Sequence, residues 1–230
     1  MIELHAFDDP RAQARALAEA VSGAVGASLA ATVDARTTLA VSGGTSPRAF
    51  FDVLAIEPLD WARVDVTLVD DRWVPETDGA SNARLVRETL LTQAASAGRF
   101  LPLVDVGVSL EARIAALNAD PSYALPNVAV LGMGEDGHTA SLFADAPVHE
   151  WTHALATEAR YVAVHPGAAP HPRVSLSMSA LKRIEHRFLL ISGERKLHVL
   201  KAAASAPQEN AISKLANDKG VRLDVYWSAK

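Results

Sequence analysis

The 230-residue chain contains no cysteine. Disulfides, thiolate catalysis and zinc sites built on sulfur are therefore excluded, and the composition fits a reducing compartment. Basic residues are never concentrated either: the densest runs are the pairs at 182–183 and 195–196, in a chain of net charge −5. We therefore expect no nucleic-acid partner. An anionic ligand would need local donors, because the overall field does not attract it.

Long apolar segments are also missing. The first ten residues carry acids where a secretory signal has bases, and no apolar stretch near them is long enough to cross a bilayer. The sequence therefore predicts a cytoplasmic protein without a membrane partner. The chain is 49% hydrophobic and 21% charged, which is typical of globular proteins. We expect residues 1–230 to form a single α/β domain.

Alanine-rich helical segments alternate with short β-branched runs. The predicted strands cover residues 37–41, 64–69, 128–131, 161–164, 187–191 and 221–227. The predicted helices cover residues 11–31, 48–55, 82–95, 110–118, 177–183, 194–204 and 211–216. Strands separated by helices require crossover connections, which produce a parallel sheet covered on both faces. We therefore predict an α/β fold with a single doubly wound, mainly parallel, Rossmann-like sheet and helices on both faces.

The most informative segment is residues 128–143. A short apolar run predicts a buried strand, and three closely spaced glycines follow it. Glycines allow backbone N–H groups to approach a ligand closely. Asp136 precedes His138 by two residues, so its carboxylate can orient the imidazole and fix which nitrogen carries the proton. A structural turn needs neither an acid nor a histidine. At the carboxyl end of a strand, where α/β sheets place their chemistry, the pattern favours a catalytic loop.

A second glycine-containing loop, SGGTSP at residues 42–47, follows the predicted strand at 37–41. Backbone N–H groups at a helix start attract anions, and hydroxyl groups add donors. One interpretation is phosphate binding. The other is a structural turn in which Ser46 caps the next helix and Pro47 is its first residue. Both can hold. The loop has neither the lysine of a nucleoside-triphosphate loop nor a dinucleotide fingerprint.

Two carboxylates and a guanidinium follow the predicted strand at 64–69. An arginine such as Arg72 can bind an anionic or carbonyl oxygen while a neighbouring acid such as Asp70 orients it. A solvated turn is the alternative, but the position at a strand end favours a functional site. Ser81 and Asn82 begin the next predicted helix, and capping alone explains both.

Two further cations, Arg173 and Lys196, are isolated in the sequence and by themselves are typical of a surface. Lys196 follows a predicted strand and a glycine near a helix start, a place from which a phosphate can be reached.

The segment His149-Glu150-Trp151-Thr152-His153 matches the zinc-peptidase pattern His-Glu-x-x-His. On a helix both histidines would share one face, with Glu150 as the base. The segment is short and no third ligand stands out, so we predict no metal site. The other histidines have no patterned partner: His5, His165, His171, His186 and His198.

Together these motifs resemble the 6-phosphogluconolactonases. The resemblance rests on SGGTSP at 42–47, VDDRWVP at 69–75 with SN at 81–82, LGMGEDGHTASLF at 131–143, PRVSLS at 172–177 and GERK at 193–196. It implies a cofactor-free hydrolase of the oxidative pentose-phosphate pathway that converts 6-phosphogluconolactone to 6-phosphogluconate. The expected partner is thus a small sugar-phosphate lactone, bound by a monomer or a homodimer.

The resemblance, combined with the chemistry of the residues, assigns roles. His138 is expected to activate water as general base, oriented by Asp136, with Asp70 and Arg72 as the other catalytic residues. Arg72, or the loop N–H groups from 132 to 137, would bind the oxyanion. The expected phosphate site is Ser42, Gly43, Gly44, Thr45, Arg173 and Lys196.

Related glucosamine-6-phosphate deaminases share the fold and the phosphate loop, and they remain the main alternative. They carry a catalytic glutamate five residues after the histidine, where this chain has Phe143. That difference favours the lactonase. A zinc peptidase and a non-catalytic sugar-phosphate sensor are the remaining alternatives.

Overall fold

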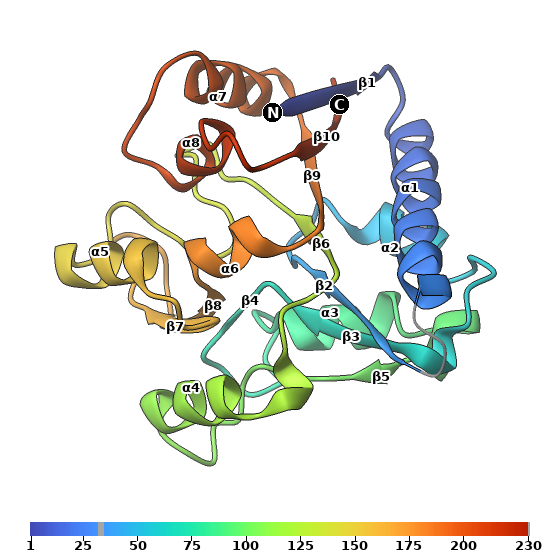
Figure 1. The fold of residues 1–230 in the computed structure, drawn as a ribbon, viewed down its shortest axis with the longest axis horizontal. Helices are drawn as coiled ribbons and strands as arrows, with labels where there is room; N and C mark the ends of the chain where they lie inside the picture. The colour runs from blue at the N-terminus through green and yellow to red at the C-terminus, as the bar shows by residue number, and fades with distance from the viewer. Residues whose placement is uncertain (32–34, 230) are drawn as a thin grey trace.

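The computed structural model describes residues 1–31 and 35–229 (Figure 1). Seven strands form a parallel central sheet in the order β1-β10-β9-β6-β2-β3-β5. The strands are β1 (Ile2–Phe7), β2 (Thr37–Val41), β3 (Val64–Leu68), β5 (Arg99–Phe100), β6 (Val128–Leu131), β9 (His186–Ser192) and β10 (Leu223–Ser228). The predicted mainly parallel sheet is confirmed.

The strand order reverses between β2 and β6. From β2 the chain proceeds to β3 on one side, whereas β6 pairs with β2 on the other side and leads outward to β9 and β10. In doubly wound sheets a ligand crevice forms beyond the carboxyl ends of the strands at such a reversal. The loops at residues 42–47 and 132–138 follow β2 and β6, so the topology places both candidate loops at that point.

Helices cover both faces of this sheet. Figure 1 shows α1 (Pro10–Ala31) and α2 (Arg48–Leu54) on one side, and α5 (Val148–Ala156), α6 (Met178–Arg183), α7 (Glu194–Ser205) and α8 (Ala211–Ala216) on the other. The remaining helices are α3 (Asn82–Thr89), α4 (Leu110–Ala119) and the 3₁₀ turns η1 (Trp61–Arg63), η2 (Gln93–Ala97) and η3 (Pro121–Tyr123). The layers are those expected of a doubly wound fold.

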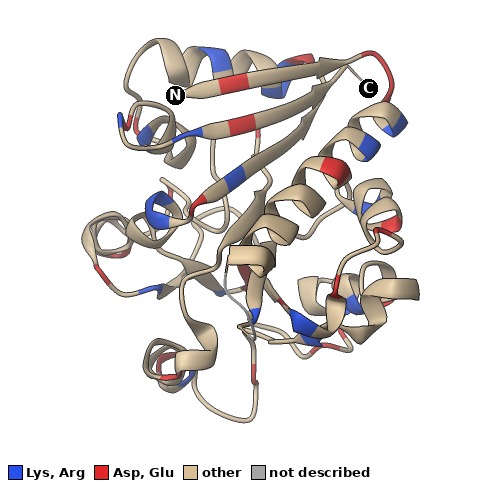
Figure 2. Cartoon of the chain, turned by 45° about the vertical axis from the view of Figure 1, so that its right-hand side comes forward, with Lys and Arg blue, Asp and Glu red and all other residues tan. Residues whose placement is uncertain are grey.

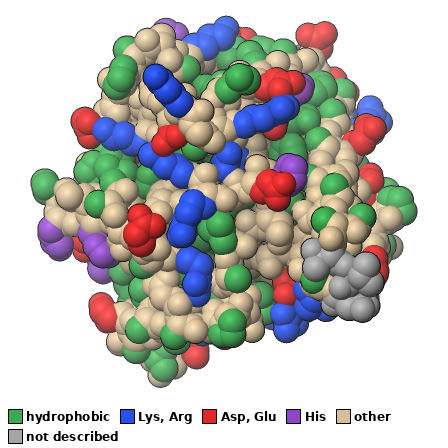
Figure 3. Space-filling view, in the orientation of Figure 1, with side chains coloured by type: hydrophobic (Ala, Val, Ile, Leu, Met, Phe, Trp, Pro, Cys, Tyr) green, Lys and Arg blue, Asp and Glu red, His purple; other side chains and the backbone are tan. Residues whose placement is uncertain are grey.

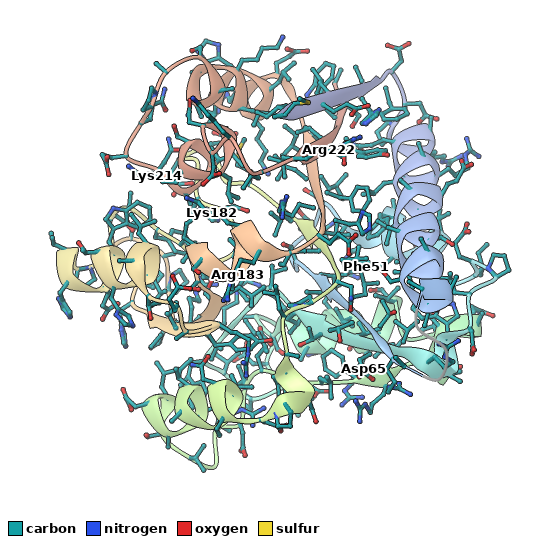
Figure 4. All side chains as sticks on the ribbon, viewed as in Figure 1. Phe51, Asp65, Lys182, Arg183, Lys214 and Arg222 are labelled. Carbon is teal, nitrogen blue, oxygen red and sulfur yellow. The ribbon has the colours of Figure 1, made fainter. Side chains whose placement is uncertain are left out.

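The core lies between the sheet and these helices. Leu17, Val21 and Val25 recur every four residues on α1, so they share one face, and all three are fully buried. Phe51 of α2 lies beside α1 (Figure 4) and is also fully buried. Burying a side chain of this size contributes about 1.5–3 kcal/mol. The four residues therefore hold this helical layer against the sheet.

A second sheet, which the sequence did not predict, contains β4 (Asp70–Arg72), β8 (Arg173–Leu176) and β7 (Tyr161–Val164) in the order β4-β8-β7. Its pairings are antiparallel. The predicted strand at 161–164 exists but belongs to this sheet and not to the central one. The register places Arg72 directly opposite Arg173. Residues opposite each other project from the same face, so this sheet brings two distant arginines together.

The predicted helix at 82–95 is too long. Helix α3 ends at Thr89, and Gln93 begins the turn η2 with a φ of 48°. That left-handed conformation is incompatible with a continuous α-helix. The amide of Ala95 then donates to the carbonyl of Ala55 at 3.1 Å, an anchor that sequence periodicity does not reveal. The segment 148–156, read only as a short motif, is a regular helix, α5.

Charges of both signs are scattered over the helices and strands (Figure 2). A row of basic side chains runs down the face seen in Figure 3, and Figure 4 labels Arg222, Lys214 and Lys182 on this face. Each of these three pairs with a carboxylate within 3.0 Å. The charges of these three residues are therefore partly neutralised by neighbouring acids. Across the described residues, no helix is both long and apolar enough to cross a membrane.

Candidate functional site

A cavity of about 490 Å³ lies where the loops after β2 and β6 meet. This volume is within the range of small-molecule sites. All the residues predicted to act in catalysis or phosphate binding line it, except Asp136: Ser42, Gly43, Gly44, Thr45, Asp70, Arg72, His138, Arg173 and Lys196. Because these residues come from distant parts of the chain, their convergence is produced by the fold.

His138 lines the cavity and is hydrogen-bonded to Asp136. Its Nδ1 lies 2.6 Å from Oδ1 of Asp136, and its backbone N–H donates to the same oxygen at 3.2 Å. The hydrogen bond from His138 holds the pKa of Asp136 below its ordinary value. Asp136 therefore stays ionised near neutral pH and fixes the ring orientation. Because Nδ1 is engaged, Nε2 is the nitrogen available for proton transfer.

A glycine is required at position 134 because the His138–Asp136 pair packs directly against its backbone. A Cβ atom at this position would overlap both the imidazole of His138 and Oδ1 of Asp136. The loop also closes on itself, since the N–H of Gly134 donates to the carbonyl of His138 at 3.0 Å. The glycine thus allows the backbone to pass directly beside the His–Asp pair.

The glycine N–H groups of this loop are already used. The N–H of Gly132 donates to Oγ of Ser42 at 3.0 Å, and that of Gly137 donates to the carbonyl of Gly134 at 3.1 Å. Together with the internal bond of Gly134, this satisfies all three glycine donors of the loop. These three N–H groups therefore stabilise the loop, and the binding of an oxyanion by the loop N–H groups from 132 to 137 stays a prediction.

The loop at 42–47 is joined to the loop at 132–138 at its base. Besides accepting from Gly132, Ser42 donates its backbone N–H to the carbonyl of Val130 at 2.9 Å. Pro47 is the cap of α2 and supplies no side-chain acceptor, so the predicted cap at Ser46 is wrong by one residue. Gly43 packs against the side chain of Asn82, which a Cβ atom would overlap.

Strand β4 supplies two buried carboxylates with different partners. Oδ2 of Asp70 accepts a hydrogen bond of 2.6 Å from Oγ of Ser141. Asp71 accepts from the N–H groups of Asn82 and Ala83, at 2.7 and 3.1 Å, and so binds the start of α3. Burial raises the pKa of Asp71 to about 6, although these backbone donors favour the ionised form. Asp71 is therefore an anchor for the helix, whereas Asp70 lines the cavity.

Arg72 and Arg173 form the most basic part of the cavity wall. Burial lowers the pKa of Arg173, and the charge of Arg72 lowers it further. Nη2 of Arg173 donates to the carbonyl of Pro170 at 2.9 Å, while its buried Nε has no partner among the described residues. Among the described residues, no carboxylate forms a salt bridge with either guanidinium group, so the pair favours the binding of an anion.

The ring of Phe143 lies close to both His138 and Arg173. Its ring lies 4.2 Å from the ring of His138, centroid to centroid, and the guanidinium carbon of Arg173 lies 5.8 Å from the Phe143 centroid. Phe143 is 7% exposed. It therefore gives the imidazole an apolar neighbour at the position where the deaminases carry a carboxylate.

The sequence analysis gave no site role to several residues that line the cavity, among them Asn82, Ser141, Phe143 and His171. Asn82 was interpreted as a cap, but its side chain points back to β4 and only its backbone N–H serves the helix. His171 adopts a left-handed φ of 68°, which no local pattern indicates. Ser141 lies three residues after His138, so the motif itself was the one available signal.

The His-Glu-x-x-His segment lies on α5. The carboxylate of Glu150 accepts from the backbone N–H of His165 at 2.8 Å and lies 2.9 Å from its Nδ1. Among the described residues, the triad whose ligand atoms come within 4.8 Å of one another is Glu3, His5 and Asp224, on β1 and β10. Arg222 binds both acids of that triad. The peptidase pattern therefore does not bring its residues together as a three-ligand cluster.

Comparison with known proteins identifies relatives over the whole chain. A family model described as "Glucosamine-6-phosphate isomerases/6-phosphogluconolactonase" matches residues 8–224. A 6-phosphogluconolactonase of Neisseria meningitidis is 39% identical, over 99% of this chain and 100% of its own. One of Rhizobium meliloti is 40% identical, over 98% of both chains. A crystal structure of a 6-phosphogluconolactonase from Shewanella baltica has a TM-score of 0.90 at 35% identity, covering 100% of this chain and 98% of that one.

Proposed function

The chain belongs to the glucosamine-6-phosphate isomerase/6-phosphogluconolactonase family, and on this basis we propose that it hydrolyses 6-phospho-D-glucono-1,5-lactone to 6-phospho-D-gluconate. This reaction is a step of the oxidative pentose-phosphate pathway. The observation that carries the proposal is the His138–Asp136 pair on the wall of a cavity that also contains Arg72, Arg173 and Lys196. Hydrolysis of a phosphorylated lactone requires a base that activates water and cations that bind the phosphate, and this cavity contains both.

In the proposed mechanism, Nε2 of His138 takes a proton from water. The water oxygen bonds to the lactone carbonyl carbon, and the carbonyl electrons move to oxygen to form an oxyanion. The bond from that carbon to the ring oxygen then breaks, and the imidazolium returns the proton to the ring oxygen. Ionised Asp136 stabilises the imidazolium between these two transfers. Such acid–base assistance contributes typically about 10²–10⁴-fold.

Arg72 is the proposed donor to the oxyanion. The glycine N–H groups beside His138 are occupied, whereas the guanidinium of Arg72 lines the cavity. Losing one donor of this kind costs about 3–4 kcal/mol of transition-state stabilisation. Asp70, fixed by Ser141, is the proposed carboxylate that orients this end of the substrate.

The phosphate is proposed to bind to the 42–47 loop, Arg173 and Lys196. Arg173 supplies a buried charge with an unpaired N–H, and Lys196 lies at the start of α7 on the same cavity. The loop contributes the backbone N–H groups of Gly43, Gly44 and Thr45 and the hydroxyl groups of Ser42 and Thr45. Binding energy from the phosphate positions the distant carbonyl at His138.

The direct test is to add the enzyme to freshly prepared lactone in the presence of a metal chelator and to follow acid release after subtracting spontaneous hydrolysis. We expect rapid release with lactone and no ammonia from glucosamine 6-phosphate. Ammonia release without lactone hydrolysis would instead support the deaminase. Phe143 favours the first outcome, because an apolar ring occupies the position of the deaminase acid.

The cytoplasmic location and the monomeric or homodimeric state stay predictions of the sequence, as does the lack of nucleic-acid and membrane partners. Light scattering of the purified protein measures the oligomeric state directly.

A further inference from the structure

Asn82 is the buried residue of the cavity wall for which the proposed mechanism gives no role. It is 3% exposed, although it is the first residue of α3, where a polar side chain usually faces solvent. Its backbone N–H donates to Asp71, so the helix cap does not need its side chain. The side chain therefore serves another purpose.

Both polar atoms of the Asn82 side chain are used toward β4. Nδ2 donates to the carbonyl of Asp70 at 2.9 Å, and Oδ1 accepts from Nη1 of Arg72. The first bond fixes the amide to the strand that carries Arg72, and the second holds the end of the guanidinium. On its other side the amide packs directly against Gly43. Asn82 is thus fixed by its own partners before it binds Arg72.

The arginine needs such a support because of its neighbour. Arg72 and Arg173 are opposite each other in the β4–β8 register, and both line the same cavity. Like charges directly opposite one another in a sheet repel. Without a fixed acceptor, the long side chain of Arg72 would turn away toward water. A neutral amide oxygen holds the guanidinium in place and leaves its full charge for the substrate, which a carboxylate would not do.

We propose that Asn82 is a positioning residue that holds the Arg72 guanidinium toward the reacting end of the cavity. This inference rests on the proposed function, in which Arg72 binds the oxyanion. Asn82 contacts no reacting atom and acts only through Arg72. Its removal should therefore lower kcat more than it raises KM.

A double-mutant cycle tests the inference. Asn82→Ala should lower kcat roughly tenfold, as expected for loss of a hydrogen bond to a charged group. Because both residues act as one unit, Arg72→Ala with Asn82→Ala should be within about twofold of Arg72→Ala alone. Multiplying losses would overturn the proposal. If the alanine variant does not fold, Asn82→Ser replaces it in the cycle, since serine is polar but too short to reach Arg72.

The matched control is Ser81→Ala. Ser81 caps the same helix by accepting from the N–H of Arg84 at 3.2 Å, whereas the guanidinium of Arg72 donates to Asn82. This variant should unfold at a lower urea concentration, because a helix cap is lost, and keep its kcat. An equal loss of kcat in Ser81→Ala would reduce Asn82 to a structural role and overturn the proposal.

The side-chain NMR signal of Arg72 Nε–H separates this inference from the proposed function. In the wild type the signal should be sharp and distinct, in Asn82→Ala averaged, and in Ser81→Ala unchanged. An unchanged signal in Asn82→Ala would overturn the positioning role, even if the protein is an active lactonase. If the wild type fails to hydrolyse lactone, the proposed function fails while this measurement still decides whether Asn82 holds Arg72.

Discussion

Two histidines of this protein have almost the same local partner but very different surroundings. His138 places Nδ1 2.6 Å from Asp136, and His165 places Nδ1 2.9 Å from Glu150. In each pair the carboxylate also accepts from the backbone N–H of its histidine. His138 lines the cavity with its cations, whereas His165 is not among the described residues that line it. A His–acid pair is thus not a catalytic site by itself, because it also needs a substrate-sized cavity.

Alanine substitution of each histidine tests this comparison most directly. His138→Ala should lower turnover of the lactone by about 10²–10⁴-fold, because the base is lost. His165→Ala should change turnover by less than about twofold, because its surface pair holds only β7 to α5. The measurement is the initial rate of acid release at neutral pH. Equal losses in both variants would contradict the difference that the cavity is proposed to make.

Asp71 shows what happens to a buried carboxylate without a histidine partner. Hydrogen bonding lowers the pKa of Asp136, whereas burial raises that of Asp71 from 3.8 to about 6. The folded state therefore holds the Asp71 proton more tightly than the unfolded state. Its contribution to stability is greatest below pH 3.8 and is lost as the pH rises through about 6. The change is on the order of 3 kcal/mol.

Urea unfolding at pH 4 to 7 measures this effect. The free energy of unfolding of the wild type, relative to Asp71→Asn, should fall as the pH rises across that window. Parallel pH profiles for the two proteins would show that burial does not control this group. Asp136 should contribute in the opposite direction, with stability lost as the pH falls below its ordinary pKa.

Distorting the His138–Asp136 pair without removing either partner sharpens the comparison. Gly134→Ala places a Cβ atom against His138 and Asp136, so the ring must turn and kcat should fall roughly ten- to thirtyfold. Gly23→Ala is the control, because it lies on α1 with nothing within 4 Å of the added atom. That variant should retain activity and gain slightly in stability. A fully active Gly134→Ala would mean that the ring orientation is unimportant.

The smallest effect on activity is expected from substitution of a cation at the His138 site. Arg173→Ala should raise KM about tenfold with a smaller change in kcat, because a charge-assisted contact to phosphate is lost. Arg183→Ala, at the exposed end of α6, should leave both constants unchanged. Steady-state kinetics with the lactone distinguish the two variants. A loss confined to kcat would move Arg173 from phosphate binding to the chemical step.

Local patterns predicted five of the seven strands of the central sheet and missed β1 and β5, the strands at its two edges. The strands at 37–41 and 128–131 match the prediction to the residue, because the first is rich in β-branched side chains and the second is a continuous, fully buried apolar run. In the second sheet β7 was predicted as a strand, but β4 and β8 were not, because β4 is a charged triplet and β8 begins with an arginine. Their conformation is stabilised by pairing with each other, and pairing between residues a hundred positions apart leaves no periodic signal.

The sequence by itself determined the chemical groups of this protein: a histidine two residues after an acid, two glycine loops that follow strands, and a few isolated cations. Only the tertiary structure decided which of these groups act together. It paired the glycine amides of residues 132–137 with partners in their own loop and on Ser42, and it paired His165 with a distant glutamate. It also turned the Asn82 side chain from the helix end to Arg72. Hydrogen-bond partners depend on proximity in space, which chain order does not specify.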